Sequence, residues 1–184
     1  ESLQIDDPSD VDTTSTMTIG HAALAGCSKL VSLSIPFVGP RDVTNVDRTV
    51  VTGYDSTPHL PVGYPSGTQA SQYRLGWIFG TYDYSPFGMV AVSQASTSDF
   101  YISPVLKNVS LTHQTVLLMN SFYNLKTLET VDIGEHTKYS QQWVFGENTH
   151  LQSVTIPFIG MERGYTYYKW PEYGWLHEKR TLFA

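Results

Sequence analysis

Leu128-Glu129-Thr130-Val131-Asp132-Ile133 is one of four copies of the pattern Leu-x-x-Leu/Val-x-Ile/Leu in this chain. The other copies occupy residues 30–35, 106–111 and 151–156. The last three copies begin at positions 106, 128 and 151, so the step from one copy to the next is almost constant. Apolar and polar residues alternate in the second half of each copy, which predicts a short strand with one face directed into a core.

A second feature keeps a fixed offset from the first. Six residues before each leading leucine stands a large apolar residue: Leu24, Phe100, Phe122 and Phe145. A single unit of this kind cannot bury its own apolar face, so the units are expected to stack with parallel strands on one side. The spacing lies within the range of about 20–29 residues typical of leucine-rich repeats. We therefore predict a β-rich repeat solenoid; an ordinary β-sandwich, which would space its strands irregularly, is the alternative.

The region from residue 40 to residue 99 does not continue the period and is interpreted as an insertion of roughly sixty residues. Its first part is rich in Pro and Gly, which favours an extended loop over a helix. Its second part contains Leu75-Gly76-Trp77-Ile78-Phe79-Gly80, which is too apolar to lie free in water. We expect that segment to pack on the end of the solenoid or to form a small hairpin with Met89-Val90-Ala91-Val92.

The beginning of the insertion occurs twice, because Ser34-Ile35-Pro36-Phe37-Val38-Gly39 is similar to Thr155-Ile156-Pro157-Phe158-Ile159-Gly160. The chain is therefore expected to be a segment of a longer protein, or to depend on a neighbour. The resulting division is an acidic flexible lead-in (1–16), a leucine-rich repeat (17–39), the insertion (40–99), three leucine-rich repeats (100–160), and the start of a second insertion or an aromatic C-terminal cap (161–184).

Residues 19–36 carry a resemblance to a known family. They read Ile-Gly-His-Ala-Ala-Leu-Ala-Gly-Cys-Ser-Lys-Leu-Val-Ser-Leu-Ser-Ile-Pro. This run resembles the unit of BspA-like leucine-rich repeats from bacterial and some protist surface proteins, with Leu24 in place of the usual Phe. The insertion is similar to one found in such proteins from gut-type anaerobes. The resemblance implies an extracellular or cell-surface location and adhesion to matrix, cells or glycans. It implies no particular site residues.

The composition disfavours two classes of partner. The 17 acidic and 11 basic residues give a formal net charge of −6. Binding to nucleic acid needs clustered Lys and Arg, so a nucleic-acid partner is not expected. No stretch approaches the run of about 20 apolar residues that spans a bilayer, so membrane insertion is not expected either.

Residue types that carry chemistry are present but lack the required spacing. Cys27 precedes an apolar stretch, which favours a buried structural thiol over a nucleophile. Asp6, Asp10 and Asp12 lack the central Gly and the final Glu of a calcium loop, and they are interpreted as part of the lead-in. The six histidines are scattered without ligand spacing, so no metal site is expected.

Paired carboxylates for glycoside hydrolysis can be drawn at Glu129 with Asp132 and at Glu162 with Glu172. Nothing in their sequence setting suggests a shifted pKa, so solvated surface groups are favoured. The sequence contains no Gly-x-Ser-x-Gly elbow and no phosphate-binding glycine motif. The chain is accordingly predicted not to be an enzyme and to hold no cofactor.

Two aromatic segments are the best candidates for binding a partner, because Tyr and Trp dominate recognition hot spots. The alternative is that these side chains seal the open core of the last repeat. The candidate residues are Tyr82, Tyr84, Phe87, Tyr165, Tyr167, Tyr168, Trp170, Tyr173 and Trp175. The functional hypothesis is a non-catalytic extracellular recognition or adhesion module that binds a protein or glycan through the solenoid face or the insertions. A structural spacer in a larger surface protein, and a glycan-binding accessory to an enzyme domain elsewhere, are the alternatives.

Overall fold

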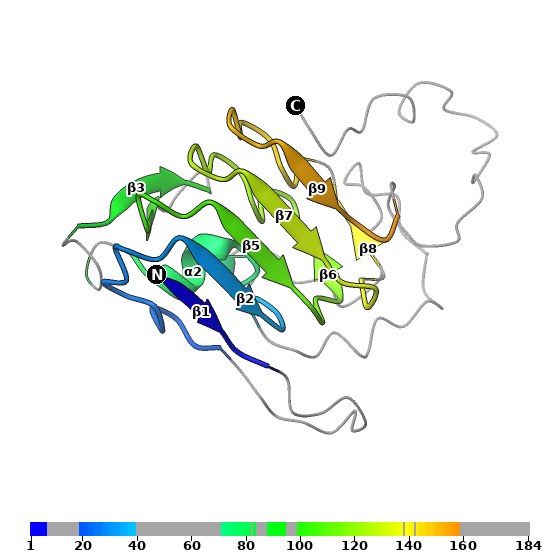
Figure 1. The fold of residues 1–184 in the computed structure, drawn as a ribbon, viewed down its shortest axis with the longest axis horizontal. Helices are drawn as coiled ribbons and strands as arrows, with labels where there is room; N and C mark the ends of the chain where they lie inside the picture. Colours follow the sequence, from blue (N-terminus) through cyan, green and yellow to red (C-terminus); the bar gives the residue numbers. More distant parts are fainter. Residues whose placement is uncertain are drawn as a thin grey trace, which may run out of the picture.

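The main feature of the fold is a parallel sheet of five short strands, side by side in Figure 1. The computed structural model describes residues 1–6, 19–39, 71–81, 83, 88–94, 99–137, 139–141 and 143–158. The strands follow in the order β1 (Ser2–Gln4), β2 (Ser32–Ile35), β5 (Asn108–Leu111), β7 (Thr130–Ile133) and β9 (Ser153–Thr155). The described residues are thus β-rich, with a mostly parallel sheet and little helix.

The register of this sheet follows the spacing of the sequence pattern. Asn108 pairs with Thr130 and Thr130 pairs with Ser153, so equivalent positions of successive copies lie opposite one another. Ser32 pairs with Asn108, which brings the first copy beside the second across the insertion. Within each central strand the burial alternates as the sequence predicts. The buried side chains are those of Leu33, Ile35, Val109, Leu111, Val131 and Ile133.

The edge strand β1 corrects one prediction. Residues 1–16 were expected to form a flexible lead-in, yet Ser2–Gln4 pair with Ser32–Ser34 of β2. The reason is that Ser2-Leu3-Gln4 has the same polar–apolar–polar alternation as the other strands, and Leu3 packs against the core in register with Leu33. Residues 7–16 lie outside the described residues.

A series of turns lies behind the sheet, and each turn has the same backbone form. A buried Leu24, Phe122 or Phe145 stands at the centre of each turn. The residue two positions before it and the residue two positions after it have positive φ. These residues are Ala22, Asn120 and Trp143 before the centre and Gly26, Asn124 and Glu147 after it. The turns are joined by backbone hydrogen bonds, and the rings of Phe122 and Phe145 lie 5.3 Å apart between centroids.

The short helix α2 (Leu75–Phe79) belongs to the same series of turns. The amides of Ala22 and Leu24 donate to the carbonyl oxygens of Trp77 (3.1 Å) and Ile78 (2.7 Å), and on the other side Leu75 N donates to Ser121 O (2.9 Å). Figure 1 shows α2 behind the sheet. The hydrogen bond from Leu24 to Ile78 repeats the one from Phe122 to Val144, so Trp77–Gly80 occupies the place that Trp143–Gly146 holds in its own turn.

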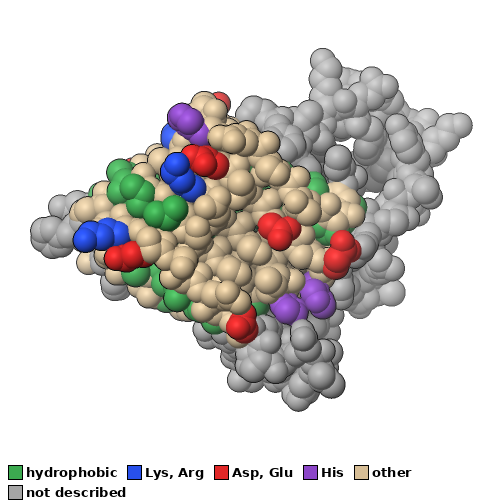
Figure 2. Space-filling model, viewed as in Figure 1, with side chains coloured by type: hydrophobic (Ala, Val, Ile, Leu, Met, Phe, Trp, Pro, Cys, Tyr) green, Lys and Arg blue, Asp and Glu red, His purple; other side chains and the backbone are tan. Residues whose placement is uncertain are grey.

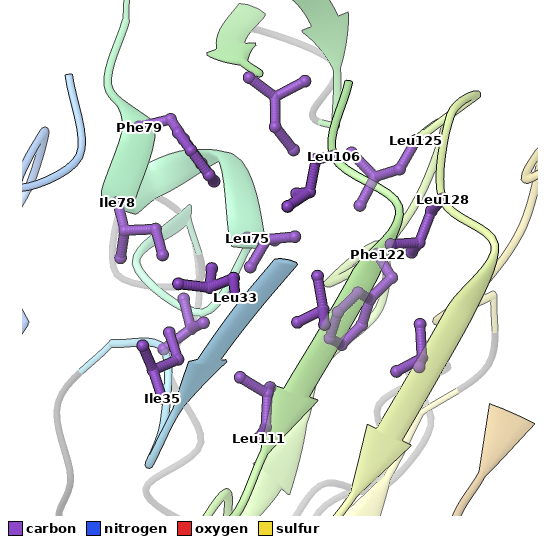
Figure 3. Close-up of a cluster of buried hydrophobic side chains, with 14 of the residues drawn as sticks. Leu33, Ile35, Leu75, Ile78, Phe79, Leu106, Leu111, Phe122, Leu125 and Leu128 are labelled. Atoms are coloured by element: carbon purple, nitrogen blue, oxygen red, sulfur yellow. The ribbon is translucent and has the colours of Figure 1, made fainter. Parts of the chain in front are cut away.

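The apolar core fills the space between the sheet and these turns. Leu75, Ile78 and Phe79 of α2 are almost fully buried and lie beside β2 in Figure 3. The expected burial of residues 75–80 is therefore confirmed. Their predicted place at the end of the stack is wrong, since α2 lies between the turn at Leu24 and the turn at Phe122.

The predicted hairpin between residues 75–80 and 89–92 is also wrong. β3 (Val90–Ser93) instead pairs antiparallel with β4 (Asp99–Ile102), which places Val92 opposite Phe100. Pairing in this register buries both side chains against the core. Phe100 is therefore a core residue, as its offset predicted, but it stands in a strand, whereas Phe122 and Phe145 stand in turns. A second small sheet pairs β6 (Val116–Leu117) with β8 (Tyr139–Ser140) in parallel.

Candidate functional site

The outer surface of the parallel sheet presents two rows of polar side chains, which together we call the polar strand face. The alternation that buries Leu33, Val109 and Val131 turns the residues on either side of them towards solvent. The first row consists of Ser2, Ser32, Asn108, Thr130 and Ser153. The second row consists of Gln4, Ser34, Ser110, Asp132 and Thr155.

Side-chain hydrogen bonds join the three central residues of the first row. Asn108 Nδ2 donates to Ser32 Oγ at 3.0 Å, and Thr130 Oγ1 donates to Asn108 Oδ1 at 2.8 Å. Both ends of the Asn108 amide are thereby used, which fixes its orientation across three strands. This row is a stiff hydrogen-bonded ladder on the centre of the sheet.

The second row keeps its hydrogen-bonding capacity for solvent. Within the described part of the chain, the side chains of Ser34, Ser110 and Asp132 make no hydrogen bond. At the end of the row, Gln4 Nε2 donates to Asp6 Oδ1 at 2.8 Å. Among the ten positions of the polar strand face, Asp132 carries the one charge. The free hydroxyls can both donate hydrogen bonds to and accept them from a molecule laid across the strands, and the carboxylate can accept them.

The polar strand face is hollowed into a shallow, open depression. Its lining comes from four adjacent strands, β1, β2, β5 and β7, and includes members of both rows. Figure 2, viewed from the same side as Figure 1, shows few charged side chains over the strands. Small-molecule sites usually enclose most of their ligand, so an open surface of this kind suits a broad partner that lies across the sheet.

Two ion pairs involve charged residues of the described part of the chain. Lys107 Nζ lies 2.7 Å from Glu129 Oε1, and Lys126 Nζ lies 3.2 Å from Glu147 Oε2. Glu129 is thus ion-paired, while Asp132 stands on the polar strand face. The suggested partners Glu162 and Glu172 lie outside the described residues. Burial lowers the pKa of the Arg74 guanidinium, which precedes α2 behind the sheet.

None of the nine aromatic residues proposed from the sequence falls within the described residues, and the structure therefore leaves that prediction as it was. They are Tyr82, Tyr84, Phe87, Tyr165, Tyr167, Tyr168, Trp170, Tyr173 and Trp175. Asp10 and Asp12 also lie outside the described ranges. Residues 1–16 therefore contribute only Asp6 of the suggested calcium ligands to the described structure.

Two pairs of aromatic rings involve histidine. His113 and His136 follow β5 and β7 and stack with centroids 4.4 Å apart, while His21 packs on Trp77 at 4.2 Å. Across the described ranges, no group of three or more His, Cys, Asp or Glu side chains is arranged to hold a metal ion. In the described structure each of these rings packs against another ring.

Cys27 corrects a further prediction, because its side chain is exposed and not buried. It stands three residues after Leu24, where the equivalent residue of the next turns is Leu125 or Asn148. Leu125 is covered by the following turn, since Asn148 Oδ1 accepts a hydrogen bond from Leu125 N at 2.6 Å. The amide of Cys27 instead donates to Leu24 O at 3.2 Å, within its own turn, and does not repeat the bond from Leu125 to the following turn.

Comparison with known proteins adds no identity. No family model, curated protein or solved structure matches this chain. Within the described ranges, no helix has the length and apolar character needed to cross a bilayer. The sequence predicts only that one face of each strand is directed into a core, which leaves the other face to solvent. The position between the two apolar residues of each Val-x-Ile, which holds Ser34, Ser110 and Asp132, was the available signal for the second row of the polar strand face.

Proposed function

We propose that this chain is a non-catalytic recognition module, built as a segment of a BspA-like leucine-rich-repeat solenoid, that binds its partner across the polar strand face. The observation that carries the proposal is the pair of aligned polar rows, one internally hydrogen-bonded and one with free hydrogen-bonding groups. Such a surface is stiff, broad and nearly uncharged, which suits a neutral glycan or a polar protein surface.

The assignment to a repeat solenoid is supported by two independent regularities. Strand positions recur in register at an almost constant step, from Asn108 to Thr130 to Ser153. The turns recur with positive φ at both flanks of the buried central residue, as at Asn120 and Asn124 around Phe122. A stack built from equivalent units presents equivalent side chains at a constant step, which is how solenoids form extended binding surfaces.

The cell-surface location and the adhesive role rest on the resemblance of residues 19–36. A partner bound by one such module contacts a shallow surface, so the affinity of a single copy is expected to be modest. Clustering of several copies on a surface raises the effective strength of binding without new contacts. A screen for partners therefore needs the module in clustered form.

The test is a screen of the purified chain on beads against matrix proteins and a glycan array. Ser110→Arg places a bulky charged side chain in the middle of the second row. Thr149→Arg makes the same change of size and charge at an exposed turn residue outside the sheet. The proposal predicts saturable binding that Ser110→Arg abolishes and Thr149→Arg preserves, with thermal unfolding unchanged in both variants.

Two results would change the conclusion. If the folded chain binds no protein or glycan above background, the structural spacer becomes the better function. If binding is saturable but both variants retain it, the partner lies on another surface and the polar strand face is not the site. A glycan-binding accessory role would be favoured if the bound molecule is the substrate of an enzyme domain in the same longer protein.

A further inference from the structure

Trp143 stands in the turn centred on Phe145, on the side of the core opposite the polar strand face. We call this side of the molecule the turn side. The Trp143 side chain is 44% exposed, and its backbone has a φ of 56°. Positive φ is uncommon for a residue other than Gly, and for a bulky side chain it is a true outlier. Exposure of an indole and a left-handed backbone are both unfavourable. The left-handed backbone recurs at the equivalent residues Ala22 and Asn120 and therefore belongs to the turn. The exposed indole is what distinguishes Trp143 from them.

A second tryptophan stands at the same place in another layer of turns. Trp77-Ile78-Phe79-Gly80 occupies the position in α2 that Trp143-Val144-Phe145-Gly146 has in its own turn. Trp77 is half-buried, and the ring of His21 packs on it with a centroid distance of 4.2 Å. The His21–Trp77 pair is therefore a second aromatic platform on the turn side.

The two platforms are separated by one intervening turn, which is centred on Phe122. Leu75 of α2 is hydrogen-bonded to Ser121 of that turn, and Phe122 is hydrogen-bonded to Val144 of the next. One step between turns is 5.3 Å, measured between the rings of Phe122 and Phe145. Neighbouring strands lie about 4.8 Å apart, so two steps from turn to turn place the two platforms roughly 10 Å apart. A single small ring cannot cover both, whereas an extended chain of rings can.

The intervening turn supplies an apolar bridge and holds a polar group that precedes the turn of Trp143. Met119 is 39% exposed and belongs to the turn between the platforms. Its amide donates to Gln141 Oε1 at 2.6 Å, which fixes the orientation of the Gln141 side chain. Within the described part of the chain, Gln141 Nε2 has no acceptor. A donor held in this way can serve a hydroxyl group of a molecule that lies over Met119.

From these observations we infer that the turn side binds a neutral polysaccharide. One pyranose ring would stack on the indole of Trp143 and another on the His21–Trp77 platform. The C–H face of a pyranose packs against an aromatic face while its hydroxyls point outward to donors such as Gln141 Nε2. This site is separate from the polar strand face, and it does not depend on which partner that face binds.

The experiment is affinity electrophoresis of the full chain through gels that contain a neutral soluble polysaccharide. Mixed-linkage β-glucan, xylan and galactomannan are the probes. Trp143→Gly removes the indole and also relieves the left-handed backbone, so the variant remains folded. Val90→Ala is the matched control, because Val90 is 41% exposed on β3. We expect retardation by at least one probe, weakened about tenfold in Trp143→Gly and unchanged in Val90→Ala.

Two further variants keep the result decisive. Gln141→Ala should weaken binding less than Trp143→Gly, because one hydrogen bond is lost and the aromatic contact remains. Ser110→Arg, which blocks the polar strand face, should leave polysaccharide binding intact. The inference is overturned if no probe retards the chain, or if Trp143→Gly binds as the unaltered chain does. Loss of polysaccharide binding in Ser110→Arg alone would also overturn it, while leaving the proposed function in place.

Discussion

Gln94 Oε1 accepts a hydrogen bond from Gly76 N at 2.7 Å, which ties the residue after β3 to the helix α2. The other end of the same amide, Nε2, donates to Ser121 O at 3.2 Å. Gln94 is fully buried and thus links the β3–β4 hairpin, α2 and the turn at Phe122. The close approach of Phe100 and Gln94 to Gly76 leaves no room for a side chain at that residue.

Replacing Gln94 with Leu should destabilise the protein by about 1–3 kcal/mol, because the buried amide of Gly76 loses its acceptor and a donor to Ser121 O disappears. The free energy of unfolding in urea measures the effect. Gln152→Leu is the control, because it makes the same substitution at an exposed glutamine. Equal stability of the two variants would show that Gln94 does not hold α2 in place.

Gly134→Ala should be destabilising by about 1–3 kcal/mol, because the new methyl group would overlap the carbonyl of Thr112 in the adjacent turn. Gly20→Ala introduces the same methyl group into open space and should leave stability nearly unchanged. Thermal unfolding of the two variants is the measurement. A lower melting temperature for Gly20→Ala than for Gly134→Ala would contradict the packing of the strand ends.

Ala22→Gly and Ala23→Gly should have opposite effects on stability. Ala22 has a φ of 57°, and a left-handed backbone costs an L-residue about 1–2 kcal/mol. Glycine removes that cost, so Ala22→Gly should stabilise by up to about 1 kcal/mol after its larger loss of chain entropy. Ala23 has no positive φ, and Ala23→Gly should destabilise by about 0.5–1 kcal/mol. If both variants change the free energy of unfolding in urea in the same direction, the left-handed conformation of Ala22 is contradicted.

Binding across the polar strand face should depend weakly on salt, because Asp132 is the one charged residue in its two rows. Raising sodium chloride from about 50 mM to about 500 mM screens exposed charges almost completely. The bead-binding curve of the clustered chain should therefore shift by less than about threefold, whereas a partner held by phosphate contacts would be lost over this range. A loss of binding at high salt would point to a charged partner and against this face.

The strands were predictable because their signal is local. The alternation in Leu128–Ile133 and its copies identifies the buried residues, and the regular step between copies predicts parallel neighbours. The lead-in was misjudged because Ser2-Leu3-Gln4 is too short to carry a convincing alternation by itself. Its strand character comes from the partner β2, which a local pattern does not contain.

The role of α2 was missed for a different reason. Trp77–Gly80 repeats Trp143–Gly146, but the match covers four residues and lies outside the regular period. Counting back six residues from the leading leucine Leu106 would place Phe100 at the centre of a turn, but Phe100 lies in β4. Cys27 was misjudged because its exposure depends on contacts with the next layer, which the local sequence does not contain. The two rows of the polar strand face could not be predicted, because their alignment depends on the register between strands and composition alone does not provide it.

The register of β2 has a consequence for the order in which the protein folds. Ser32 pairs with Asn108 across a long stretch of chain, whereas the pairs from β5 to β7 and from β7 to β9 each close a much shorter loop. Shorter loops cost less chain entropy to close, and contacts of low sequence separation form faster. Residues 106–156 are therefore expected to form the folding nucleus. Although it is synthesised earlier, the segment around Leu24 and β2 then docks later, with β1 at its outer edge, after α2 has supplied the layer on which it rests.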